Sequence, residues 1–236
     1  NNNRVAIDYN GLSPHLVHAL VATEDERFYE HSGVDFIALG RAVVKRGVMG
    51  QASAGGGSTI TQQLAKQLFS EKAHSTVERL LQKPIEWIIA VKLERYFTKE
   101  EILAMYFNYF DFLHNAVGIK RAANVYFNKE PRKLTVTESA MLVGLCKNPS
   151  MFNPLRHPER CLQRRNVVLM QMVKSGYVTK DEYKELSQRP LGLHFTRSKP
   201  VSGAGDYFQA FLRQYMMAKK PERENYQSWQ NRQFVL

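Results

Sequence analysis

Residues 24–33 read Glu24-Asp25-Glu26-Arg27-Phe28-Tyr29-Glu30-His31-Ser32-Gly33. Before this stretch, Ser13 is a typical helix N-cap residue, and Pro14 follows it at the first helical position. These two residues predict the start of a helix that ends at about Tyr29 and so includes the first part of the stretch. Asp35 predicts the start of a second helix, which ends at about Gly47.

Glu24 stands out on the first predicted helix. It lies one turn beyond Leu20 and one turn before Phe28, so it interrupts a face that is otherwise apolar. A carboxylate in such a place loses hydration, which favours proton uptake and suits a general base. The alternative is a structural carboxylate that pairs with Arg27 or caps a loop.

Capping boxes predict further helix starts along the chain. In each box Thr is followed three residues later by Glu or Gln, at Thr59–Gln62, Thr98–Glu101, Thr135–Glu138 and Thr179–Glu182. Alternating strand patterns are scarce. The predicted fold class is therefore mainly α, with a flexible glycine-rich loop over residues 50–57 and a connector over residues 189–205.

Composition and charge limit the choice of function. The chain has 236 residues, of which 44% are hydrophobic and 23% charged, values that are ordinary for a globular domain. Lys and Arg outnumber Asp and Glu by 33 to 22. This excess suits an anionic partner such as a nucleic acid, a lipid headgroup or a pyrophosphate, although solubility alone is a fair alternative.

The cysteines and the apolar runs identify no metal site and no membrane span. Cys146 and Cys161 have no metal-ligand spacing. No apolar run approaches the roughly 20 residues that a spanning helix needs. The polar start and the open end of the chain predict a piece of a longer protein.

The glycine block at residues 55–57 leads into Ser58, Thr59, Gln63 and Lys66. A glycine loop before a hydroxyl-rich helix start offers free backbone N–H groups and the positive end of a helix dipole, which suit a phosphate. The alternative is a plain linker.

A third block combines charges of both signs on one helical stripe. Offsets of three, four and seven residues place Arg79, Gln82, Lys83 and Glu86 on the same side. Pro84 suits this stripe best if a new helix starts near Lys83. The opposing face is apolar and comprises Val77, Leu80, Leu81, Ile85, Ile88 and Ile89. The alternative is a surface salt bridge of little energetic value.

Together with residues 99–108 and 164–169, these blocks resemble the five signature motifs of the peptidoglycan glycosyltransferases. These are the transglycosylase domains of class A penicillin-binding proteins and of monofunctional relatives. Residues 24–33 match the first motif at every fixed position, and Gln82 stands where the third motif has arginine. The resemblance covers roughly residues 20–175.

The resemblance implies a lysozyme-like helical lobe beside a smaller, membrane-facing jaw lobe at roughly residues 34–57. The glycosyltransferase domain is then expected at residues 1–188 and the connector toward a further domain at residues 189–236. Apolar and basic residues between Phe36 and Gly50 suit an interfacial segment of the jaw. A plain buried helix is the alternative.

The resemblance also implies the reaction, an inverting polymerisation of lipid II into β-1,4-linked strands with release of undecaprenyl pyrophosphate. It makes Glu24 the catalytic base and Glu86 the second essential carboxylate. The expected substrate- and pyrophosphate-binding residues are Ser58, Thr59, Gln63, Lys66, Arg79, Lys83 and Arg164.

Cofactor, partners and location follow from the same resemblance. The sequence itself requires no cofactor and shows no metal ligands, although a divalent cation, Mg or Mn, often accompanies this activity. The expected partners are lipid II, the growing glycan strand, the membrane surface and other cell-wall synthesis proteins, without nucleic acid. The expected location is the extracytoplasmic (periplasmic) face of the cell membrane, with an anchor outside this chain.

Two other functions are weighed against this one. A lysozyme or lytic transglycosylase needs no pyrophosphate site, so the blocks around Ser58 and Lys83 argue against it. A basic nucleic-acid-binding module leaves Glu24 and Glu86 unexplained. Transpeptidation is excluded for this chain because Ser-x-x-Lys and Lys-Thr-Gly motifs are missing.

Overall fold

The first predicted helix is present in the computed structural model, which describes residues 6–41, 57–69 and 76–196, with the backbone alone for residues 76–81. Helix α1 spans Pro14–Glu24, with Ser13 as its N-cap residue. It ends at Glu24 rather than at about Tyr29, because Asp25 leaves helical geometry with φ −159° and ψ 75°. The carboxylate of Asp25 bonds instead to groups outside α1, as described below.

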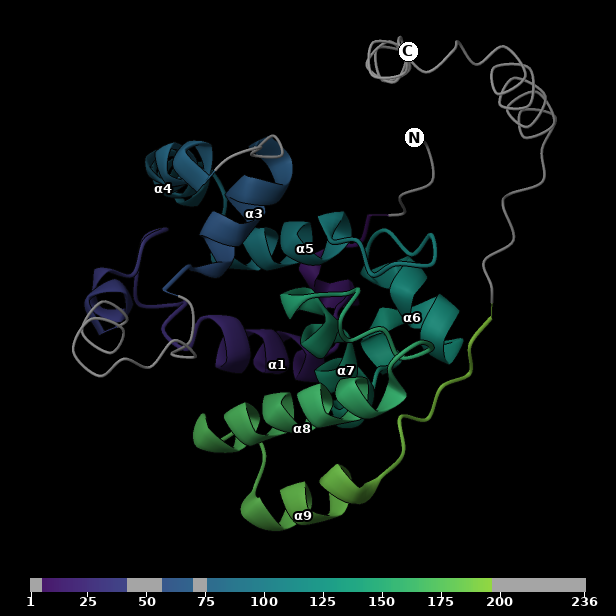
Figure 1. Ribbon diagram of the computed structural model, residues 1–236. Coiled ribbons are helices and arrows are strands. Elements are labelled where there is room, and N and C mark those ends of the chain that lie inside the picture. Colours follow the sequence, from purple (N-terminus) through teal and green to yellow (C-terminus); the bar gives the residue numbers. More distant parts are fainter. Residues whose placement is uncertain (1–5, 42–56, 70–75, 197–236) are drawn as a thin grey trace, which may run out of the picture. The chain divides into compact units, whose positions relative to one another are not determined.

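The described residues are mainly helical, which confirms the predicted fold class (Figure 1). After α1, residues 36–41 are also helical. The other elements are η1 (Tyr9–Gly11), α3 (Ile60–Phe69), α4 (Thr76–Tyr96), α5 (Lys99–Tyr109), α6 (Ile119–Phe127), η2 (Pro131–Lys133), α7 (Val136–Lys147), α8 (Pro158–Lys174) and α9 (Lys180–Gln188). Within these ranges the only β pairing is an isolated bridge between Asp111 and Val117.

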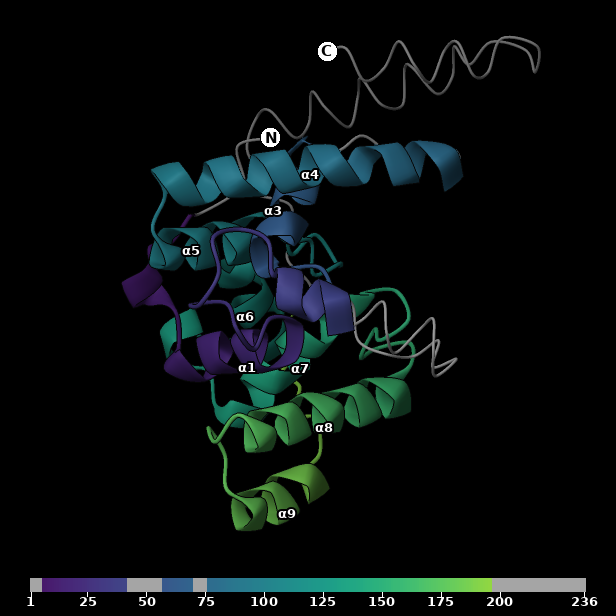
Figure 2. The ribbon, with the colours of Figure 1, turned by 90° about the vertical axis from the view of Figure 1, so that its left-hand side faces the viewer.

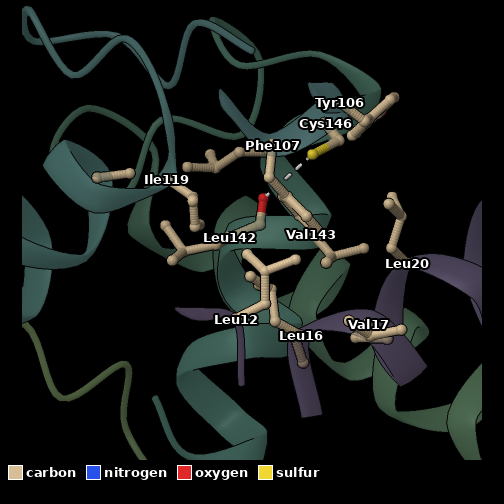
Figure 3. Packing of buried hydrophobic residues seen from close by; sticks show 14 of the residues in the cluster. Leu12, Leu16, Val17, Leu20, Tyr106, Phe107, Ile119, Leu142, Val143 and Cys146 are labelled. Atoms are coloured by element: carbon tan, nitrogen blue, oxygen red, sulfur yellow. Dashed lines mark hydrogen bonds between the residues drawn. The ribbon is translucent and has the colours of Figure 1, made fainter. Parts of the chain in front are cut away.

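Helix α7 forms the centre of the described unit. Its residues from Glu138 to Cys146 are all buried, and it packs against both α1 and α8. On one side of this centre α3 packs against α4 and α5, and on the other α9 packs against α8 (Figure 2). Leu16 and Leu20 of α1 lie among the buried apolar side chains, together with Leu142 of α7 (Figure 3). This packing holds the end of α1 next to α3 and α8.

All four predicted capping boxes are present. The Thr side chain accepts a hydrogen bond from the backbone N–H three residues later, and the Glu or Gln side chain accepts one from the Thr N–H, at Thr59–Gln62, Thr98–Glu101, Thr135–Glu138 and Thr179–Glu182. Each box satisfies two backbone donors that a helix start leaves open. Asp35 likewise accepts from the N–H groups of Ile37 and Ala38, as its predicted capping role requires.

Helix α4 runs through Pro84 without a break, so the prediction of a new helix near Lys83 is wrong. Pro84 is exposed to solvent. A proline inside a helix removes one backbone hydrogen bond and costs about 3 kcal/mol or more. On the solvent side, water can bond to the carbonyl that is left without a partner, so the helix continues.

The predicted apolar face of α4 is divided between solvent and core, because Ile85 and Ile88 are exposed whereas Ile89 packs against the core. The side chains of Val77, Leu80 and Leu81 lie outside the described residues. Ile85 and Ile88 are 57% and 59% exposed, and the inward stripe consists of Glu86, Ala90 and Leu93. Helical spacing shows which residues share a face, but it does not show which face packs. The small side chain of Ala90 permits close packing, whereas Ile85 and Ile88 lie on the outside.

Residues 189–196 pack against the helical unit, although the sequence assigns them to a connector. The N–H groups of His194 and Thr196 donate to the carbonyls of Tyr126 and Val125 at 2.9 Å and 2.8 Å. Phe195 packs on the core. The helix end expected near Gly47, most of the predicted jaw and loop, and residues 197–236 lie outside the described residues. Among the described helices, none is long and apolar enough to cross a membrane.

Candidate active site

Glu24 lies where three helices meet. It is the last residue of α1, and its side chain is 16% exposed. Its Oε2 accepts a hydrogen bond of 3.0 Å from Nε2 of Gln63 on α3. Its Oε1 lies 3.4 Å from Nη2 of Arg164 on α8. Glu24, Gln63 and Arg164 are called the Glu24 cluster below. Its carboxylate is largely desolvated but still open to a ligand.

The Arg164 guanidinium is itself almost buried, with 10% of its side chain exposed. Burial lowers its pKa, and the neighbouring Glu24 carboxylate acts in the opposite direction. The guanidinium lies over the ring of Phe152, 5.9 Å from the centroid, and its Nε has no hydrogen-bond partner. This cation is therefore buried with one donor unsatisfied, in addition to its contact with Glu24.

Asp25 joins the end of α1 to the start of α3. Its carboxylate accepts from the N–H of Ile60 at 3.0 Å and contacts Nε2 of His31 at 3.0 Å. Close by, the Thr59 hydroxyl donates to the carbonyl of Gly33 at 2.6 Å. These contacts are buried, and they fasten the first sequence block to the second. The Asp, His and Gly of the first block therefore support the site rather than line it.

Lys83, Glu86 and Ser58 form a second polar group, called the Lys83 cluster. Lys83 Nζ lies 2.8 Å from Glu86 Oε2 and 3.3 Å from Ser58 Oγ. Glu86 is 3% exposed as a residue, while 42% of the Lys83 side chain is exposed. The buried carboxylate thus holds a cation whose other side is open to solvent.

The other residues predicted to bind pyrophosphate are not part of either cluster. Lys66 lies on the exposed side of α3 and forms no ion pair with a described residue. The Thr59 hydroxyl both donates to Gly33 and accepts from the Gln62 N–H, so its bonds serve the fold. The side chain of Arg79 lies outside the described residues. Pyrophosphate binding by these residues stays a prediction.

The two clusters are joined by residues 58–63, with Ser58 in one and Gln63 in the other. A family model described as Transglycosylase matches residues 1–173 of the chain. The chain belongs to the transglycosylase family. That match covers all of the residues in both clusters.

The chain is also similar to individual penicillin-binding proteins. The chain is 40% identical over 220 residues to penicillin-binding protein 1A of Aquifex aeolicus, covering 93% of this chain and 29% of the relative. It is 38% identical to penicillin-binding protein 1F of Bacillus subtilis, covering 90% of this chain and 29% of the relative. The crystal structure of penicillin-binding protein 1A from Haemophilus influenzae is 28% identical, with a TM-score of 0.42 over 70% of this chain and 21% of that chain. The chain therefore spans less than a third of these relatives.

The fourth and fifth family motifs contribute mostly to the framework of this transglycosylase-family fold. Lys99 pairs with Glu94 at 2.7 Å and donates to the carbonyl of His31 at 2.7 Å. Asn108 exchanges two hydrogen bonds with the backbone of Ile7, at 3.1 Å and 2.8 Å. Arg165 is completely buried and donates to backbone carbonyls at the end of α9. Two residues of these motifs contact Glu24 or Gln63, namely Arg164 and Tyr106.

Tyr106 and Cys146 lie behind the Glu24 cluster, and sequence reasoning missed both as parts of the site. The Tyr106 hydroxyl donates to Gln63 Oε1 at 3.0 Å, and Figure 3 shows Cys146 beside Tyr106. Tyr106 lies within the fourth motif, but its place on a regular apolar face concealed its polar group. Burial raises the pKa of Tyr106 and of Cys146, so both stay protonated.

The described residues contain no group of three or more His, Cys, Asp and Glu side chains that could hold a metal ion. The divalent cation expected from the resemblance stays a prediction.

Proposed function

We propose that this chain polymerises lipid II into β-1,4-linked glycan strands, with inversion at the donor anomeric carbon and release of undecaprenyl pyrophosphate. The observation that carries the proposal is the presence of two different polar clusters joined by residues 58–63. One presents a partly open carboxylate, Glu24, and the other a partly open cation, Lys83. Polymerisation by this route needs a base for the acceptor and a cation for the leaving group.

Glu24 is assigned the role of general base. It takes the proton from the 4-hydroxyl of the incoming lipid II, and that oxygen forms a bond to the anomeric carbon of the growing chain. The bond from this carbon to the pyrophosphate oxygen breaks, and the electron pair leaves with the pyrophosphate. Because the attack comes from the face opposite the leaving group, an α-linked donor gives a β-linked product. The donors from Gln63 and Arg164 stabilise the charged carboxylate, which is the form that accepts a proton.

The Lys83 cluster is assigned to the leaving pyrophosphate. Fixed cations stabilise negative charge as it develops, and they act most strongly where water is excluded. Glu86 contacts Lys83 at 2.8 Å, so its proposed role is to hold this cation in place. Lys66, Arg79 and Arg164 are the further candidates for contacts with the pyrophosphate, and Ser58 and Thr59 bring the α3 N-terminus near it.

We further propose that the chain works at the extracytoplasmic face of the cell membrane, beside other cell-wall synthesis proteins. Phe36 and Ile37, at the start of the helical residues 36–41, are 70% and 58% exposed. Arg41 on the same segment is also exposed. Exposed apolar and basic side chains together favour contact with a lipid surface. Residues 1–188 stay the proposed catalytic domain, and a divalent cation stays a proposed companion of the leaving group.

Product analysis tests this function against the related hydrolases. The chain is incubated with lipid II in detergent, and the products are separated by gel electrophoresis. We expect glycan polymer and free undecaprenyl pyrophosphate, with β linkages in the polymer. In a parallel reaction the chain receives preformed glycan strands. Cleavage of those strands without polymer formation from lipid II would show a lytic enzyme instead.

A further inference from the structure

Tyr106 connects the buried interior to the Glu24 cluster through one hydrogen bond. Its side chain is completely buried on α5. Its ring lies edge-on to Phe107 and stacks against Phe110, with centroids 5.7 Å and 6.0 Å away. Its hydroxyl donates to Gln63 Oε1 at 3.0 Å. The ring is therefore fixed by packing, and its hydroxyl points at one end of the Gln63 amide.

The two ends of the Gln63 amide have different partners. Nε2 donates to Glu24 Oε2 at 3.0 Å, and Oε1 accepts from Tyr106. A turn of the amide by 180° would place its oxygen against the carboxylate oxygen, and two acceptors repel each other. A carboxylate only accepts, so it takes the amide nitrogen, and the phenol donates to the amide oxygen at the other end. The Tyr106 bond therefore holds the amide in the orientation that offers Glu24 a donor.

We propose that Tyr106 is a positioning residue for the base Glu24, because its hydroxyl orients the Gln63 amide toward the carboxylate. The inference rests on the proposed polymerisation. It adds to the proposed mechanism a residue that does not contact substrate, because Tyr106 acts on Glu24 through Gln63. Its consequence is that the ionised form of Glu24 depends on a hydroxyl on a different helix.

The other groups around Glu24 do not replace this donor. Arg164 of α8 is the one cation that pairs with Glu24 among the described residues, and at 3.4 Å its contact is long. Cys146 of α7 lies near Glu24, and burial raises the pKa of its thiol, so it stays neutral. Burial keeps Tyr106 neutral in the same way. The 3.0 Å bond from Gln63 is thus the shortest described contact to the Glu24 carboxylate.

Tyr106→Phe removes the hydroxyl and keeps the ring. The amide then loses the partner of its oxygen and can move away from Glu24, which weakens the support for the charged carboxylate. We expect kcat for lipid II polymerisation to fall about 10-fold to 100-fold, the range for losing the bond from the Gln63 amide to the charged Glu24 carboxylate. KM should change little, because Tyr106 does not contact substrate. The acid limb of the pH–rate profile should move to higher pH.

Tyr126→Phe is the matched control. Tyr126 is also completely buried, and its hydroxyl donates to the carbonyl of Phe112 at 2.6 Å, away from the Glu24 cluster. This variant should lose some stability in thermal unfolding, yet keep the pH–rate profile of the parent chain. A purely structural role of the Tyr106 hydroxyl would make the two variants behave alike.

A double-mutant cycle with Gln63→Ala separates orientation of the amide from other effects. Gln63→Ala alone should move the acid limb to higher pH. Adding Tyr106→Phe to it should have no further effect, because the amide that Tyr106 orients is gone. Additive effects, or an unchanged profile in Tyr106→Phe, would overturn the proposal. An unchanged profile in Gln63→Ala would also overturn it, even if Tyr106→Phe failed to fold.

The experiment distinguishes this inference from the function on which it rests. If the parent chain forms no polymer from lipid II, the proposed function fails. If the parent polymerises and Tyr106→Phe keeps the same kcat and profile, the positioning role alone fails.

Discussion

Replacing Gly33 by alanine tests how closely α4 is held against the residues that follow α1. Gly33 has φ +93°, and a Cβ there would lie 2.8 Å from the backbone of Ala90. The backbone conformation costs a non-glycine residue about 1–2 kcal/mol. The steric overlap with backbone, which cannot turn aside, adds about 1–3 kcal/mol. Gly33→Ala should therefore lower the free energy of unfolding by about 2–5 kcal/mol.

Gly176→Ala is the matched control, because Gly176 has φ +77° and open space where its Cβ would be. It carries the conformational cost without the overlap, so it should lose only about 1–2 kcal/mol. Urea unfolding of both variants measures the difference. Polymerisation by Gly33→Ala should also fall, because a displaced α4 separates Lys83 from Ser58, now 3.3 Å apart. Equal stability of the two variants would refute the close contact between Gly33 and α4.

Three further predictions concern the framework, the surface and the thiols. Arg165→Met should lower the free energy of unfolding by about 3 kcal/mol or more, because a buried guanidinium that bonds to the end of α9 is lost. The control is Arg160→Met on the exposed side of α8, which should leave urea unfolding nearly unchanged. Replacing Phe36 and Ile37 together by serine should weaken co-sedimentation with anionic lipid vesicles roughly tenfold, and unchanged binding would argue against a membrane contact there. Burial raises the pKa of Cys161 to about 12, so its thiol should resist iodoacetamide in the folded chain and react after unfolding in urea. Because the pKa is raised only in the folded state, the Cys161 thiol should contribute fully to stability below about pH 8.5 and lose that contribution as the pH rises toward 12. Alkylation of Cys161 in the folded chain at pH 8 would contradict its burial.

Local features of the fold were predictable from the sequence. A capping box involves residues only three positions apart, so the four boxes and the mainly α class follow from short-range chemistry. The sequence also singled out Glu24 from its place on an apolar face. Its position at the end of α1, against α3 and α8, agrees with that reasoning.

Contacts between distant segments were not predictable in the same way. Helix α1 ends early because Asp25 bonds to Ile60, which lies 35 positions further along the chain. The link from Tyr106 to Gln63 spans 43 positions. No periodicity within one helix shows such a contact, because it depends on how separate helices pack.

The assignment of Gln63 and Arg164 shows the same limit. Their residue types predicted contacts with substrate or pyrophosphate, whereas the structure places both against Glu24. A donor that suits a phosphate suits a carboxylate equally well, so residue type alone does not choose between them. Pyrophosphate binding by Arg164 stays a prediction.

The central claim is that Glu24 is the base that activates the acceptor hydroxyl. The most direct measurement is the initial rate of lipid II polymerisation by Glu24→Gln, compared with Glu26→Gln, which changes an exposed carboxylate two positions away. The amide keeps the shape of Glu24 but cannot accept the proton, so the rate should fall on the order of a hundredfold or more. Glu26→Gln should polymerise like the parent chain, and both variants should stay folded at the temperature of the assay. A folded Glu24→Gln variant that polymerises at nearly the parent rate would contradict the account.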